Sequence, residues 1–155
     1  SSRGDVDNAV KYIEEAINSD ESDVLTDAGY YYELATFCIK NGKNAKAYEA
    51  AQQVVELNPE MAGKAYMLMG TIWGSTICGG NEIERRAPYW VAVDFMTKAK
   101  NADPSLAEDA NNYIRQYANY YPAASEAFMY DVVDGQSYTV SCGGMRAVTT
   151  VRTQK

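Results

Sequence analysis

The sequence contains no histidine, which removes most of the common catalytic groupings. Serine and cysteine nucleophiles are usually activated by a histidine base, and catalytic zinc sites mostly use histidine ligands. The chain also lacks a Walker phosphate loop and a GxGxxG segment that follows a strand. We therefore expect a protein that is not an enzyme, with no catalytic residues, no metal site and no cofactor.

Long hydrophobic runs and clustered cations are missing as well. No stretch of about 18 consecutive apolar residues is present, so no segment is predicted to cross a membrane. The 14 Lys and Arg residues are scattered and are outnumbered by 21 Asp and Glu residues. Because phosphate binding requires clustered cations, nucleic acid is not an expected partner. With 155 residues, 46% of them hydrophobic, the chain can bury one core, so a single domain over 1–155 is expected.

The stretch from Ala28 to Pro59 contains two helical periods in succession. Apolar or small residues of the first period recur three and four positions apart, at Tyr31, Leu34, Ala35 and Cys38. After Asn41-Gly42, the second period has its apolar residues at Ala47, Ala51, Val54 and Val55. Asn58-Pro59 then closes the unit. The sequence therefore predicts a helical hairpin over residues 24–58.

This hairpin resembles the tetratricopeptide repeat (TPR), whose pattern runs tryptophan, leucine-glycine, tyrosine, alanine, phenylalanine and a closing proline. The corresponding positions here are Tyr31, Leu34-Ala35, Cys38, Ala47, Ala51 and Pro59. The resemblance implies an all-α fold, a right-handed superhelix of stacked helical hairpins, and protein binding as the function. The C-terminal part is also similar to the ending of some secreted bacterial members. That similarity implies a periplasmic or secreted location, with the cytoplasm as the alternative.

Variations on the hairpin occupy the flanking parts of the chain. Residues 6–18 are predicted to be an amphipathic helix, similar to the second helix of a repeat whose first helix is missing. Residues 59–102 form a second repeat, interrupted by an insertion over 75–88, with Pro88 expected to open its second helix at 89–102. A capping helix is expected over 104–121, because Asp103-Pro104 starts a third helical period and Pro122 ends it.

The period changes from 3.6 to 2 in the last part, residues 123–155. A short helix over 125–131, with Phe128 as its apolar anchor, precedes two strands around Gly143-Gly144. If Cys142 faces Met145, one face holds Tyr138, Val140, Cys142, Met145, Ala147 and Val151, and the other holds Ser137, Thr139, Ser141, Arg146, Thr150 and Arg152. The apolar face is expected to cover the last helices, near Tyr117, Tyr121 and Phe128.

The three cysteines have different settings. Cys38 occupies a core position of the first repeat, so a buried small hydrophobe is expected. Cys78 and Cys142 each precede two glycines outside the regular helices. They are either free thiols or, in an oxidising compartment, partners in a disulfide. Two thiolates alone do not complete a tetrahedral metal site.

The resemblance also implies a binding surface, because the first helices of TPR arrays line a concave groove. The residues of this chain at the groove positions are Tyr32, Thr36, Lys40, Lys64, Met67, Thr71, Asn111 and Arg115. Members that clamp carboxylate tails have lysine and asparagine where this chain has Tyr32 and Thr36, so the clamp is not expected. An aromatic ring, a methionine and a few cations favour an extended or helical peptide of some acidic character.

Two further interaction modes remain open. In the first, the chain is a structural or assembly module that contacts a partner or itself through the 75–88 insertion or the C-terminal hairpin. In the second, opposite charge drives weak head-to-tail self-association, since residues 1–27 carry eight acids while residues 145–155 carry three cations and no acid.

Overall fold

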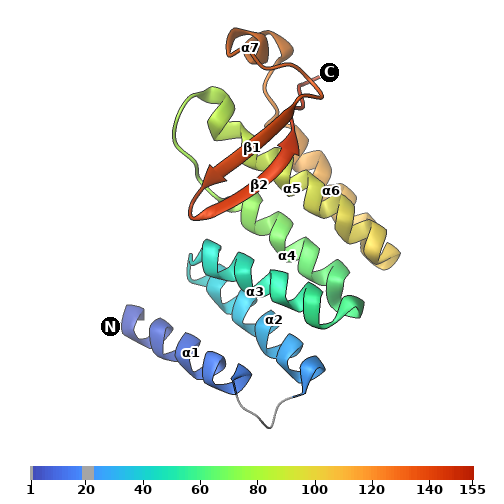
Figure 1. Cartoon of the computed structure of the whole chain (residues 1–155). Helices are drawn as coiled ribbons and strands as arrows, with labels where there is room; N and C mark the ends of the chain where they lie inside the picture. The colour runs from blue at the N-terminus through green and yellow to red at the C-terminus, as the bar shows by residue number, and fades with distance from the viewer. Residues whose placement is uncertain (1, 19–22) are drawn as a thin grey trace.

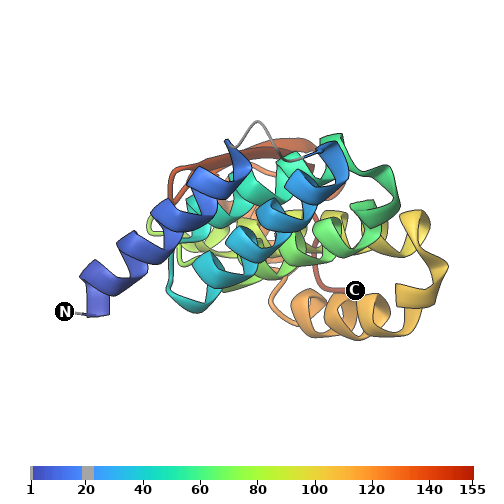
Figure 2. The ribbon, with the colours of Figure 1, turned by 90° about the horizontal axis from the view of Figure 1, so that it is seen from below.

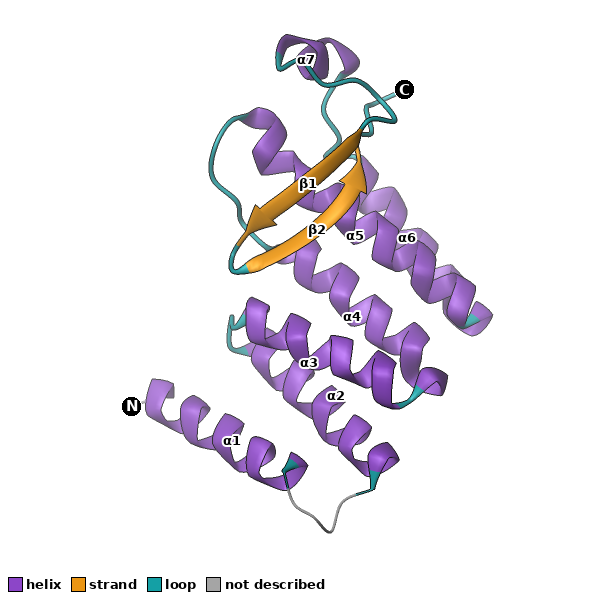
Figure 3. Ribbon diagram, viewed as in Figure 1, coloured by secondary structure: helices purple, strands orange, loops and turns teal. Residues whose placement is uncertain are grey.

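The computed structural model describes residues 2–18 and 23–155 as a stack of helices followed by a β-hairpin (Figure 1). The helices in chain order are α1 (Ser2–Ile17), α2 (Val24–Lys40), α3 (Asn44–Leu57), α4 (Ala62–Ser75), α5 (Glu82–Ala102), α6 (Ala107–Ala118) and α7 (Ala124–Met129). Short 3-10 turns, η1 (Pro59–Met61) and η2 (Pro104–Leu106), precede α4 and α6. Strands β1 (Ser137–Cys142) and β2 (Met145–Thr150) form an antiparallel pair (Figure 3). The predicted all-α architecture with one C-terminal two-stranded hairpin is confirmed, whereas the handedness of the superhelix stays a prediction.

Each helix from α1 to α5 packs against the next one along the chain, so that the stack ends with α6. The view turned by 90° shows the β-hairpin and α6 on opposite sides of this stack (Figure 2). No helix of the described part is long and apolar enough to cross a membrane.

One continuous core runs through the stack. Leu34 and Trp73, which the helical period places inward, are 4% and 0% exposed. The ring of Tyr48 meets the ring of Trp73 edge-on, with centroids 5.8 Å apart, and so joins α3 to α4. Cys38 is fully buried and free, as predicted, and burial raises the pKa of its thiol. A Cβ on Gly70 would lie 2.8 Å from Met96 Cε and 3.2 Å from the Ala92 carbonyl oxygen, so a larger residue there would require Met96 to move.

The predicted insertion over 75–88 is wrong in its extent. The loop between α4 and α5 covers only residues 76–81, and Pro88 lies buried inside α5 instead of opening it. The reason is a capping box: Asn81 accepts a bond from the Glu84 amide at 2.9 Å, and the Glu84 carboxylate accepts one from the Asn81 amide at 3.2 Å. Ile83 and Ala87 are both buried, so the core-facing stripe of α5 also begins early.

Helix bounds also differ at both ends of the chain. α1 begins at Ser2, four residues before the predicted start, and α6 ends at Ala118, which leaves Tyr121 outside the helix. In α7 the buried anchor is Ala127, whereas Phe128 is 75% exposed, so the role expected for Phe128 is wrong. Six residues form fewer than two turns, and only one of them faces the core.

The β-hairpin has the predicted register, with Cys142 opposite Met145. It packs on α5, and not on the last helices as expected: the ring of Tyr138 meets the Trp90 ring edge-on at 5.4 Å. Arg152 was predicted on the outer face, but it turns inward. Its guanidinium pairs with Asp94 and donates a bond to the Trp90 carbonyl at 2.8 Å, while Trp90 Nε1 donates to the Arg152 carbonyl at 2.9 Å. The strand ends at Thr150, which frees Arg152 from the alternation of the ladder.

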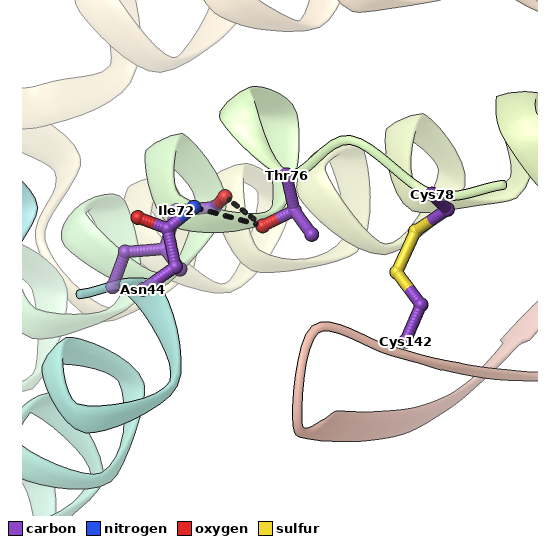
Figure 4. Close-up of a disulfide and its surroundings, with 5 residues drawn as sticks. All are labelled: Asn44, Ile72, Thr76, Cys78 and Cys142. Carbon is purple, nitrogen blue, oxygen red and sulfur yellow. Dashed lines mark hydrogen bonds between the residues drawn. A yellow bond between two sulfur atoms is a disulfide. The ribbon is translucent and has the colours of Figure 1, made fainter. Parts of the chain in front are cut away.

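A disulfide between Cys78 and Cys142 joins the α4–α5 loop to the hairpin tip (Figure 4), with the Cα atoms 5.9 Å apart. Thr76 holds the other side of the loop, because its hydroxyl donates to the Ile72 carbonyl at 2.6 Å and accepts from Asn44 of α3 at 3.2 Å. Of the alternatives for these two cysteines, the structure therefore has the disulfide.

We expect Leu34→Ala to lower the free energy of unfolding by about 2 to 5 kcal/mol, because it leaves a cavity in the buried contact between α2 and α3. Denaturant unfolding followed by circular dichroism measures the change. Glu33→Ala, an exposed neighbour, serves as the control. A loss under about 1 kcal/mol for Leu34→Ala would contradict the burial described above.

We expect reduction of the disulfide to destabilise the protein by up to about 4 kcal/mol, as the chain-entropy model assigns to a loop of this length. The measurement is the midpoint of thermal unfolding with and without reductant. The double variant Cys78→Ser, Cys142→Ser should unfold at the lower temperature in both conditions. Three alkylatable cysteines in the untreated protein, in place of Cys38 alone, would show that the bond is absent.

Candidate functional site

A groove of about 530 Å³ opens between α2, α4, η2 and α6. We call it the first-helix groove, and its lining residues are Tyr32, Thr36, Ile39, Lys40, Lys64, Met67, Leu68, Thr71, Leu106 and Tyr113. Its size lies within the range of sites that bind small ligands or the side chains of a peptide.

Six of the eight predicted groove residues line this groove, namely Tyr32, Thr36, Lys40, Lys64, Met67 and Thr71. The other two do not. The side-chain oxygen of Asn111 accepts a bond from Lys100 Nζ at 2.9 Å, and Arg115 donates to its neighbour Asn112 on α6.

The helical period explains why these side chains converge. Tyr32 and Thr36 are four residues apart and lie on one face of α2, beside the core stripe that contains Leu34. Met67 and Thr71 have the same spacing on α4. The two helices therefore present matching rows to the same groove.

Sequence reasoning missed the apolar part of the lining, which is Ile39, Leu68, Leu106 and Tyr113. Ile39 and Leu68 directly adjoin predicted groove residues, so a wider stripe on each first helix would have included them. Tyr113 is half-buried at the groove edge.

Hydrogen bonds inside the helices decide what the threonines offer. The Thr36 hydroxyl donates to the Glu33 carbonyl at 2.9 Å, and the Thr71 hydroxyl donates to the Leu68 carbonyl at 2.8 Å. Because both hydroxyl hydrogens are used within the helices, neither is available as a donor to a ligand. The charged donors on the groove walls are the ammonium groups of Lys40 and Lys64, and Tyr32 and Tyr113 add phenolic hydroxyls.

Both lysines are exposed, and neither forms an ion pair with an acid among the described residues. By contrast, a polar hollow of about 560 Å³ beside α1 contains Lys46, which pairs with Glu14 at 2.7 Å. The first-helix groove therefore keeps positive charge that a ligand can use.

A stack of tyrosines holds the α6 side of the groove. The ring of Tyr113 stacks on the ring of Tyr117, with centroids 5.9 Å apart. Burial, and then the neighbouring Tyr113 and Tyr89, raise the pKa of Tyr117 to about 12, so its hydroxyl stays protonated at neutral pH. A Cβ on Gly74 of α4 would lie 2.5 Å from the Tyr117 ring, so this glycine admits the stack against α4.

The charged residues at the start of α5 form ion pairs with one another. Arg85 and Arg86 both pair with Glu82, and Arg86 also donates to the Tyr120 carbonyl at 2.9 Å. The pair with Arg86 holds the pKa of Glu82 below its usual value. Within the described part of the chain, no group of three or more histidine, cysteine or acidic side chains is arranged to hold a metal ion.

Residues 28–61 match the family model for the tetratricopeptide repeat. The match covers most of α2, all of α3 and η1, so it coincides with the helical hairpin that the sequence pattern predicts. A comparison with curated proteins found no match. The helical hairpin α4–α5 repeats the same arrangement, with Met69 and Trp73 in the core positions that Leu34 and Cys38 hold in the first. The match and the stacked hairpins support a tetratricopeptide repeat at residues 28–61 within this stack of helices.

Proposed function

We propose that the protein is a non-enzymatic scaffold that binds a segment of a protein partner in the first-helix groove. Tetratricopeptide repeats in general serve protein–protein interaction. The observation that carries the proposal is the groove itself, which is lined by apolar side chains together with two lysines that have no acidic partner among the described residues.

The position of the lysines suggests what the ligand looks like. Lys40 ends α2, whereas Lys64 lies near the start of α4, which is the equivalent helix of the next repeat. Measured along the helix axes, the two lysines are therefore about three helical turns apart, roughly 16 Å. An extended segment covers that length with about five residues. We propose a ligand with apolar side chains flanked by acidic ones.

An assembly module that uses the α4–α5 loop is a second candidate. The observation that favours it is Ile77, which is 95% exposed beside the disulfide. The loop is short, however, and the cations next to it are paired with Glu82, so it offers a smaller and less charged surface than the groove. Ile77→Ser separates the two candidates, because it should leave binding in the groove unchanged.

We expect the double variant Lys40→Glu, Lys64→Glu to lose at least about tenfold in affinity for its peptides, about 1.4 kcal/mol. The peptides are selected from a random displayed library on the wild-type protein, and binding is measured by fluorescence anisotropy. Salt should weaken the wild-type binding, because the lysines are exposed.

Lys11→Glu, Lys155→Glu is the matched control, since it makes the same change in net charge at two exposed lysines outside the groove. It should bind as the wild type does. Equal affinities of the groove variant and this control would contradict the proposal, and a loss only in Ile77→Ser would favour the assembly module.

A further inference from the structure

The short segment around α7 exposes several large apolar side chains to solvent. Phe128 and Met129 are 75% and 78% exposed, and Tyr130 and Val133 are exposed as well. We call residues 124–133 the α7 knob. Clusters of exposed apolar residues on a folded protein mark contact surfaces. In Figure 1, α7 projects from the end of the stack that lies away from α2.

Packing and hydrogen bonds hold the knob in a defined conformation. Ala127 is buried beneath it, and the amide of Val132 donates to the Ala127 carbonyl at 3.1 Å. Asp134 fixes its far end, because the carboxylate accepts bonds from the Thr153 amide at 2.9 Å and hydroxyl at 3.2 Å. A contact surface that is already ordered loses little conformational entropy when it binds.

Of the two acids in the knob, Glu126 accepts a bond from the Ala123 amide at 3.2 Å at the start of α7, and Asp131 follows its end. Asp131 is exposed, has a φ of 62° and forms no ion pair with a cation of the described residues. A residue in the left-handed conformation directly after a helix turns the chain sharply. Asp131 therefore follows Phe128 and Met129 closely in the sequence and lies at the same end of α7.

These features are the complement of the first-helix groove. The groove offers apolar side chains and the ammonium groups of Lys40 and Lys64, which have no acidic partner among the described residues, and the knob offers aromatic and aliphatic side chains with a carboxylate. We propose that the α7 knob of one copy inserts into the first-helix groove of a second copy. This inference rests on the proposed function, because it uses the same groove and names one occupant of it.

Part of the charge at the two ends of the chain is already paired within one copy, which weakens the case for head-to-tail association through these charges alone. Asp7 and Glu14 of α1 pair with Lys43 and Lys46 at 3.0 and 2.7 Å, and Arg152 pairs with Asp94. Two of the eight N-terminal acids, Asp20 and Glu21, lie outside the described residues. Knob and groove are different patches of one chain, so the contact is heterologous and can repeat from copy to copy.

Sedimentation velocity over a range of concentrations tests the inference with three variants. The knob variant is Phe128→Ser, Met129→Ser, and the groove variant is Lys40→Glu, Lys64→Glu. The control is Tyr12→Ser, Val148→Ser, which removes side chains of similar exposure, 74% and 67%, outside both surfaces. The average mass of the wild type and of the control should rise with concentration, and the knob and groove variants should each stay monomeric.

A mixture of the knob variant and the groove variant gives a more specific test. The knob variant keeps an intact groove and the groove variant keeps an intact knob, so a mixture should form a one-to-one pair that does not grow further. A wild type that stays monomeric at every concentration, a mixture without the pair, or knob and groove variants that associate like the wild type would each overturn the inference.

Asp131→Asn isolates the charge, because asparagine also tolerates a positive φ. It should weaken the association of the wild type and remove most of its salt dependence, while it changes nothing further in the groove variant. If the wild type stays monomeric but peptides selected from the library still bind it and fail to bind the groove variant, the proposed function stands and this inference alone falls.

Discussion

The burial of α5 is the constraint on which the C-terminal half of the molecule depends. This helix packs against α4, α6 and the β-hairpin, and its Trp90 is fully buried. A buried indole needs a partner for its N–H, and the Arg152 carbonyl provides it. Arg152 in turn reaches Asp94, one helical turn beyond Trp90, so a single residue after the hairpin satisfies the backbone and a charge of α5 together. Without the hairpin and the residues after it, α5 would expose the side that contains Trp90 and Asp94.

This arrangement separates a closed side of the stack from an open one. The hairpin and the disulfide cover α5 and reach toward the start of α3, where a Cβ on Gly144 would lie 3.3 Å from Ala45 Cβ. The first helices α2, α4 and α6 keep their other side, and that is where the groove lies. An added structural element therefore stiffens the array without occupying the surface that a partner would use.

The sequence was sufficient wherever one helical period decided the outcome. Leu34, Cys38 and Trp73 are buried because spacing by three and four residues places them on one face, and Tyr32 and Met67 reach the groove because they lie beside that face. The failures came from places where two local signals compete. Pro88 is a typical first-turn residue, but the capping box at Asn81 starts the helix earlier. Asn111 and Arg115 are groove positions by analogy with complete repeats, yet Asn111 bonds to Lys100 of α5 and Arg115 bonds to Asn112, one turn earlier on α6.

The disulfide also sets how the chain would respond to being pulled. It closes a covalent ring between Cys78 and Cys142, a sequence separation of 64, which contains α5, α6, α7 and β1, whereas β2 lies outside the ring. Under tension applied at the two ends of the chain, these residues would add no length even after they unfold, so roughly 210 Å of contour would stay hidden. A force-bearing chain of such molecules would extend only through the helices before the ring and through residues 143–155 after it. The oxidised protein would thus act as a short tether with a stiff C-terminal half, and reduction would turn the same chain into a long one.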